Sequence, residues 1–190
     1  MICLRKLVEE DLMPLWEIAY SHPNPIWKQY DAPYFDDYQC FPSFEEFKLQ
    51  KSEYFLNNSN RLGIFVDYKL VGTVSRYWEC QQTRWMELGI DIYESEFWNA
   101  GIGTNAMLQW IDRSFQDYLE LEHLGLTTWS GNFGMMKLAK KLRMKKEAHI
   151  PKVRYYQGVY FDSIKYGILR EEWEKNKWSS LSKQWKQLRR

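Results

Sequence analysis

The chain has 190 residues, of which 45% are hydrophobic and 27% charged, and its formal net charge at pH 7 is +1. This balance predicts one globular domain that can bury a core, and it provides no general electrostatic case for nucleic-acid binding. Three scattered cysteines without CxxC spacing favour reduced thiols in a cytoplasmic protein over a disulfide framework or a zinc site, and the lack of a long apolar run argues against a membrane span.

The first third of the chain predicts a strand, two helices and an irregular segment between the helices. Residues 2–7 form an apolar strand, and the acidic residues 9–11 begin a helix whose apolar side chains share one face. Residues 23–42 are rich in Pro, Asp and aromatic residues without a clean period, so we expect an ordered loop with at most one helical turn. A capping box beginning at Ser43 then predicts a helix to about residue 56.

The middle of the chain predicts a meander of three antiparallel strands, at residues 61–67, 70–78 and 84–93, separated by short polar turns. The most strongly patterned segment begins near Gly101. Apolar side chains recur there at positions 107, 111, 115 and 118, which predicts a long amphipathic helix.

The last third predicts a strand at residues 123–128, a short basic helix at 135–142 and a hairpin formed by 147–156 and 159–169. Beyond residue 173, an apolar stripe within a basic segment predicts an amphipathic helix over 174–190. The stripe consists of Trp178, Leu181, Trp185 and Leu188. We expect this helix to pack on its own domain or on a second subunit, and binding to nucleic acid or a membrane surface is the alternative.

Two glycines at the start of the long helix predict an anion site. Gly101 and Gly103 lack Cβ atoms, so their amides can approach a phosphate, and the helix N-terminus adds unpaired donors. The pattern Gly101-x-Gly103-x-x-Ala106 formally matches a dinucleotide-binding fingerprint, but the preceding strand ends too early and no acid ends the next strand. A glycine turn that only starts a helix is the alternative.

The segment LGIDIYESEFWNAGIGTNAM, followed about 30 residues later by WSGNFGMMKLAKKLRMKKEA, resembles the GNAT acyltransferases, especially their RimJ/RimL-like branch. The resemblance covers roughly residues 2–173. It implies an α/β (α+β) domain with a mixed, mostly antiparallel twisted sheet of about six or seven strands and helices on both faces. The C-terminal amphipathic helix would follow this domain.

The resemblance also implies a binding site for acetyl-CoA. Main-chain amides would hold its pyrophosphate at Trp98, Asn99, Ala100, Gly101, Ile102, Gly103 and Thr104. The edge formed by Ile90, Asp91 and Ile92 would pair with the pantetheine arm, and Asn132 would hydrogen-bond it or simply cap the next helix. Ala100 replaces a basic residue frequent in relatives, and Ala139 replaces the Tyr that protonates the departing thiolate.

Catalytic candidates come from the chemistry of amine acylation, which needs a proton acceptor and stabilised leaving group. Glu87 places a charge on a strand that is otherwise covered, so it is the candidate base, with a solvent-facing strand residue as the alternative. Ser130 is a candidate donor near sulfur, or a simple turn serine.

The aromatic loop is the candidate acceptor pocket. Trp27, Tyr30 and Tyr34 stand beside several aspartates, a combination that suits a cationic amine. A solvated acidic loop whose aromatic residues cap the core is the alternative. The predicted function is transfer of an acetyl group from acetyl-CoA to a primary amine of a small molecule or protein N-terminus, directly within a ternary complex. A non-catalytic CoA-binding protein on the same fold is the alternative, and a homodimer is left open.

Overall fold

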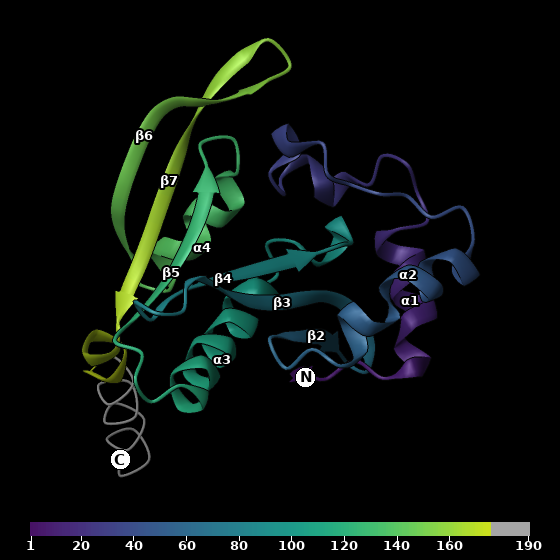
Figure 1. Cartoon of the computed structure of the whole chain (residues 1–190), viewed down its shortest axis with the longest axis horizontal. Coiled ribbons are helices and arrows are strands. Elements are labelled where there is room, and N and C mark those ends of the chain that lie inside the picture. The colour runs from purple at the N-terminus through teal and green to yellow at the C-terminus, as the bar shows by residue number, and fades with distance from the viewer. Residues whose placement is uncertain (176–190) are drawn as a thin grey trace.

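The structure is a computed structural model that describes residues 1–175 as one sheet flanked by helices (Figure 1). The strands are β1 Ile2–Arg5, β2 Arg61–Val66, β3 Lys69–Cys80, β4 Trp85–Ile92, β5 His123–Trp129, β6 Lys145–Tyr156 and β7 Val159–Leu169. The helices are α1 Leu12–Ala19, α2 Phe44–Leu56, α3 Ile102–Asp117 and α4 Phe133–Lys141, with short 3-10 turns at η1 Glu9–Asp11, η2 Ile26–Gln29, η3 Pro33–Phe35 and η4 Ser95–Phe97.

The sheet has seven strands in the order β1-β2-β3-β4-β5-β7-β6. Every neighbouring pair is antiparallel except β4 and β5, which run parallel. This confirms the predicted mixed, mostly antiparallel architecture. The β4 and β5 strands are paired only at Met86 with Leu124 and at Glu87 with Gly125, and they then diverge (Figure 1). The sheet is therefore split along its middle.

Two apolar clusters lie on opposite faces of the sheet. On one face, α3 and α4 pack against the strands around the fully buried Trp110, whose Nε1 donates to the Ser75 carbonyl at 2.9 Å. On the other face, α1 and α2 cover the first strands around the buried Phe47 and Phe55. Burial of side chains on both faces is what selects a sheet between two helical layers.

Local sequence signals account for several element boundaries. Ser43 Oγ accepts the Glu46 amide at 3.3 Å, so the expected cap starts α2. The β6–β7 hairpin turns at Gln157 and Gly158, both with positive φ, as a two-residue turn requires. The segment between α1 and α2 contains two short 3-10 turns, one more than the single helical turn expected in this loop.

The predicted C-terminal helix is only partly covered by the structure. Residues 170–175 are helical, and Trp173 packs into the core. The rest of that prediction, including Trp178, Leu181, Trp185 and Leu188, lies outside the described residues. Within residues 1–175, no helix is both long enough and apolar enough to cross a bilayer.

Candidate active site

The split leaves one edge of β4 without a strand partner. The Tyr93 amide donates to the Val71 carbonyl at 3.0 Å, on the side of β3. Because backbone groups alternate along a strand, those of Ile90 and Ile92 point the other way, into the gap that β5 has left. The Asp91 carbonyl points toward β3, where a Cβ added to Gly72 would lie 2.1 Å from it. Two of the three predicted edge residues therefore present main-chain groups to the gap.

Part of that edge is already in use. The Ile92 carbonyl accepts a hydrogen bond of 2.9 Å from the Trp98 indole Nε1. This contact ties the loop before α3 to the end of β4. The N–H and C=O of Ile90 and the N–H of Ile92 are left as the groups that can pair with an extended ligand.

The N-terminus of α3 opens at the same place. Gly101 has φ +82°, no atom lies within 4 Å of a Cβ built on it, and no side chain of the described residues caps the helix. Asn99 also has positive φ. The Trp98 amide is not available, because it donates to the Ser95 carbonyl at 3.0 Å. The amides that can meet an anion are therefore those of residues 99–104.

Gly103 lies where α3 faces both β4 and α4. A Cβ added there would make ordinary contacts, at 3.5 Å from Ile92 and 3.7 Å from Leu138. Together, the open strand edge and the uncapped helix fit a ligand with an amide-containing arm and a diphosphate, as acetyl-CoA has.

Asn132 acts as a helix cap in this structure. Its Oδ1 accepts the Met135 amide at 2.9 Å, and its Nδ2 donates to the Tyr30 carbonyl at 3.1 Å. The same carbonyl accepts the Trp129 Nε1 at 2.8 Å. Both polar ends of Asn132 are engaged, so the capping alternative describes it here.

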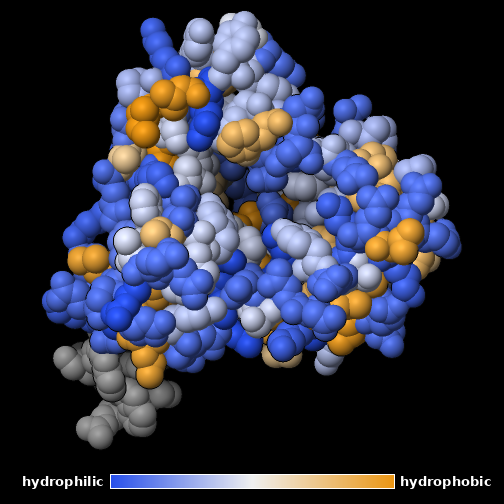
Figure 2. Space-filling view, viewed as in Figure 1, coloured by the Kyte–Doolittle hydropathy of each residue, from blue (hydrophilic) through white to orange (hydrophobic). Residues whose placement is uncertain are grey.

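The aromatic loop bridges the two sides of the split. The Tyr30 ring stands edge-on to Trp98, with centroids 5.3 Å apart, while Tyr34 stands edge-on to Trp129 at 5.8 Å. Arg154 from β6 lies over the Tyr34 ring. Figure 2 shows a deep hollow at the centre of this face, between the hairpin side and the loop side. Tyr30 and Tyr34 therefore remain candidate acceptor contacts.

Trp27 has a different position from the other two aromatic candidates. It is buried in the α1–α2 cluster, and its Nε1 donates to the Ala19 carbonyl at 3.2 Å. Its ring stands edge-on to Tyr93 at 5.2 Å. The expectation that Trp27 lines the pocket is corrected, because its side chain supports the loop from beneath.

Glu87 is buried and fully engaged. Its side chain is 1% exposed, and it accepts hydrogen bonds from Thr127 Oγ1 at 2.5 Å and Tyr77 OH at 3.2 Å. The Lys165 ammonium lies 2.6 Å from its Oε1. Glu87 is therefore not the solvent-facing strand residue considered as the alternative. To act as the catalytic base, its carboxylate would have to accept a proton and give up the ion pair with Lys165.

Ser130 extends the pairing of β5 with β7. Its amide donates to the Asp162 carbonyl at 3.0 Å, and its Oγ accepts the Asp162 amide at 2.9 Å. This is the turn role considered from the sequence. Ser130 thus has a structural role. Its hydroxyl oxygen accepts a hydrogen bond, and its hydroxyl proton takes part in neither of these two bonds.

Asp91 is the acidic group whose side chain the sequence reasoning missed. Its register partner is Thr73, so both side chains lie on the α1–α2 face of the sheet. The carboxylate makes no hydrogen bond or ion pair with any residue from 1 to 175. Burial, reinforced by the negative charge of Asp31, raises its pKa to about 7, and Arg61 and Lys28 oppose that rise. The alternation that drew attention to Glu87 also places Asp91 on that face.

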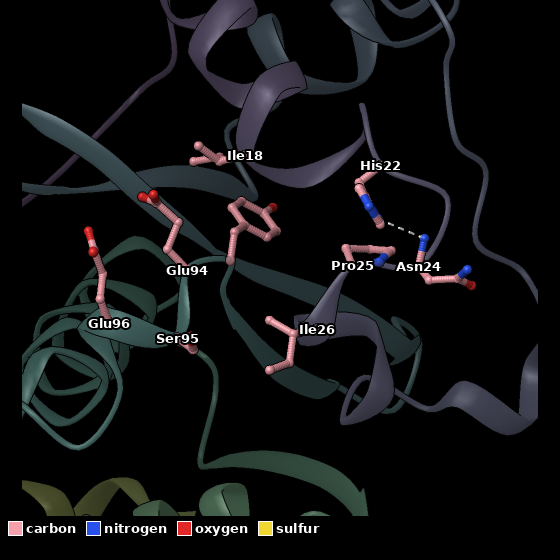
Figure 3. A pocket seen from close by; sticks show the side chains of 9 residues that line it. Ile18, His22, Asn24, Pro25, Ile26, Glu94, Ser95 and Glu96 are labelled. Atoms are coloured by element: carbon pink, nitrogen blue, oxygen red, sulfur yellow. Dashed lines mark hydrogen bonds between the residues drawn. The ribbon is translucent and has the colours of Figure 1, made fainter.

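Two surface pockets lie away from these residues. One, of about 440 Å³, lies where the end of β4 meets the loop after α1, with Glu94 and Glu96 on one side of it and His22 and Asn24 on the other (Figure 3). Lys69 pairs with both of these glutamates. The other, of about 450 Å³, lies beside the outer surface of α3. In the described residues, no group of three or more His, Cys, Asp or Glu side chains could hold a metal ion.

The fold is that of solved acetyltransferases. A GNAT-family acetyltransferase from Bacillus anthracis superposes with a TM-score of 0.70 at 17% identity, over 90% of this chain and 96% of that one. A spermidine N-acetyltransferase from Vibrio cholerae, solved with CoA and spermine, also gives a TM-score of 0.70, at 21% identity over 90% and 97% of the two chains.

The sequence comparisons define the family. The model described as an acetyltransferase (GNAT) domain matches residues 1–145, so the chain belongs to the GNAT acetyltransferase family. The relative YdaF of Bacillus subtilis (strain 168), provisionally named a ribosomal N-acetyltransferase, is 28% identical over 120 residues, 63% of this chain. The chain spans 64% of the length of YdaF. The resemblance seen in the sequence is confirmed.

Proposed function

We propose that this protein is an N-acetyltransferase that moves an acetyl group from acetyl-CoA to a primary amine of a small molecule or a protein N-terminus. The observation that carries this proposal is the meeting of the open edge of β4 with the uncapped N-terminus of α3. Amides of residues 99–104 would bind the diphosphate, and Ile90 and Ile92 would pair with the pantetheine arm.

The acceptor would reach the thioester from the hollow beneath Tyr30 and Tyr34. Direct transfer requires the amine nitrogen to lose a proton before it attacks the carbonyl carbon. The new C–N bond forms as the carbonyl electrons move to oxygen, and the C–S bond then breaks. The second proton of the nitrogen passes to the departing sulfur, which leaves as a thiol. Cationic amines are the favoured class, and polyamines such as those bound by the Vibrio cholerae neighbour belong to it.

The test measures binding and turnover separately. Calorimetry should show binding of acetyl-CoA, and a thiol reagent should then report free CoA when amines from a panel of polyamines, amino acids and N-terminal peptides are added. Absence of acetyl-CoA binding would overturn the proposal. Binding without turnover on any amine would favour the second candidate, a non-catalytic CoA-binding protein, which is motivated by Ala139 at the position of the usual acid.

A further inference from the structure

We propose that the side chain of Asp91 seats the ammonium group of the acceptor and receives its proton. This inference deepens the proposed function and rests on it. The carboxylate proposed to contact the acceptor amine lies four residues beyond Glu87, on the same face of β4.

A small side chain stands between the two carboxylates. Glu87, Gly89 and Asp91 share one face of β4 and follow each other at about 7 Å along the strand. Ser75, the register partner of Gly89, is only partly buried. Its Oγ lies 2.6 Å from the position that a Cβ on Gly89 would take. A hydroxyl side chain, and no second acid or large apolar group, therefore separates Glu87 from Asp91 on this face.

The two carboxylates differ in what surrounds them. Glu87 is 1% exposed and accepts bonds from three side chains, so an incoming amine would have to displace Lys165 to reach it. Asp91 is partly exposed and has no bonded partner among residues 1–175. Even a partly buried carboxylate without a partner is costly, and an ammonium is a strong partner for it.

The cations near Asp91 are held by other groups. Lys28 from the loop pairs with Asp31 at 3.1 Å and with Asp37 at 2.6 Å. Arg61 from β2 donates to the Thr73 hydroxyl at 3.2 Å and to the Tyr54 hydroxyl. Their positive charges act on Asp91 at a distance without bonding it. The acceptor would be the first group to bond this carboxylate.

The protonation of Asp91 suits the task. The charged and titratable groups around it are Asp31, Lys28, Arg61, Tyr93 and Tyr20. With a pKa of about 7, the carboxylate is charged in a large fraction of molecules at neutral pH, yet it can hold a proton. One proton moves from the ammonium to an Asp91 oxygen, and the neutral amine attacks. The Asp91 proton then returns to solvent.

The first experiment compares kcat/KM against pH for the wild type, Asp91→Asn and Asp67→Asn, with the most active amine of the panel. Asp91→Asn should lose a factor of about 10²–10⁴ and the rise of kcat/KM with pH near 7, while acetyl-CoA binding by calorimetry is retained. Asp67→Asn removes an exposed acid that pairs with the N-terminal ammonium, and it should keep the pH profile. An Asp91→Asn enzyme within threefold of wild type, with the same profile, would overturn this inference and leave the acetyltransferase proposal intact.

The second experiment does not depend on turnover. In protein labelled with carboxyl ¹³C-aspartate and loaded with CoA, the resonance that disappears in Asp91→Asn should titrate near pH 7. Added n-butylamine should move that titration to lower pH, because an ammonium stabilises the carboxylate. The assignment would be overturned if this resonance titrated at the pH of an ordinary exposed aspartate, or if n-butylamine did not change the pH at which it titrates. Failure of the wild type to bind CoA would instead count against the proposed function.

Discussion

At the scale of single residues, Glu87 and Asp91 are two similar carboxylates whose surroundings differ. Both belong to β4 and lie on the same face of the sheet. Three donors hold Glu87 within the protein, while Asp91 has none among the described residues. The first carboxylate stabilises the junction of four strands, β3, β4, β5 and β7, and the second is the one that we propose for the acceptor.

This difference predicts an effect on stability. The pKa of Asp91 is raised to about 7 in the folded protein, above its value of about 3.9 when unfolded, so the folded state holds its proton more tightly. Its contribution to stability is present at pH 4 and is lost as the pH rises toward 7. Asp91→Asn should therefore stabilise the protein at pH 8, by about 1–2 kcal/mol, and change it little at pH 4.

Urea unfolding at the two pH values measures this difference, and Asp67→Asn provides the control of an exposed acid. Equal midpoints for the wild type and Asp91→Asn at pH 8 would contradict the assigned environment of Asp91. A gain in stability combined with a loss of turnover would instead be typical of a functional group whose charged form is costly in the fold.

The sequence alone could indicate both carboxylates but could not separate them. Alternation within residues 85–93 places each on a covered face, and the resemblance drew attention to the main chain of Asp91 only. The donors to Glu87 include Lys165, 78 residues away along the chain. Contacts at such separations are decided by the packing of strands, and periodicity within one strand does not reveal them.

At the scale of elements, two glycines with nearly the same backbone conformation have different roles. Gly101 precedes α3 with φ +82°, and Gly158 turns the β6–β7 hairpin with φ +80°. A Cβ would meet no atom within 4 Å at either position. Replacement of either by Val should destabilise the fold by about 1–2 kcal/mol, because L-residues rarely adopt this conformation.

Only Gly101→Val should also weaken acetyl-CoA binding, by about tenfold or more, because the branched side chain would stand at the mouth of the helix. Calorimetry of the two variants tests this, with thermal unfolding to confirm that their losses of stability are comparable. Equal acetyl-CoA affinity of Gly101→Val and Gly158→Val would show that the N-terminus of α3 does not bind the cosubstrate.

The aromatic loop supplies a second test at this scale. Trp129→Phe removes the indole donor to the Tyr30 carbonyl and keeps most of the ring packing against Tyr34. We expect faster hydrogen exchange in residues 26–38 and a higher KM for the amine, with acetyl-CoA affinity changed by less than about threefold. Unchanged exchange in the loop would show that the Trp129 hydrogen bond does not restrain it.

Element positions were largely predictable, and the path of the loop was not. The apolar period of α3 and the cap of α2 are local signals, so residues near them suffice to place the helices. The loop is held instead by its Tyr30 carbonyl, which bonds side chains about a hundred residues later. For the same reason Trp27 could be counted among the pocket residues from composition, although its indole is buried.

At the scale of the whole molecule, the two halves of the sheet are joined by the cluster around Glu87. Only two residue pairs connect β4 with β5, and the Lys165 ion pair comes from β7 on the far side. Glu87→Gln should cost about 2–4 kcal/mol, because it removes the nearer of the two anions of the partly buried Lys165 ammonium and leaves only Glu79, at 3.8 Å. Adding Lys165→Met should recover part of that loss.

Chemical denaturation of the wild type, the two single variants and the double variant completes this thermodynamic cycle. A coupling energy near zero would show that the ion pair contributes little to holding the halves together. In the single variant Glu87→Gln, the pH dependence of transfer should keep its rise near 7, because Asp91 is unchanged.

The narrowness of that junction has a consequence for how the two substrates bind. The helix end proposed for phosphate and the Asp91 side chain proposed for the amine belong to the β4 half, whereas Trp129 and Asn132, which hold the aromatic loop, belong to the β5 half. A few degrees of rotation about two residue pairs would widen or narrow the gap for the thioester arm and tilt the roof over the acceptor in the same movement. Binding of acetyl-CoA and binding of the amine would then depend on the same angle between the two halves of the sheet. Either substrate, by stabilising one angle, would favour binding of the other.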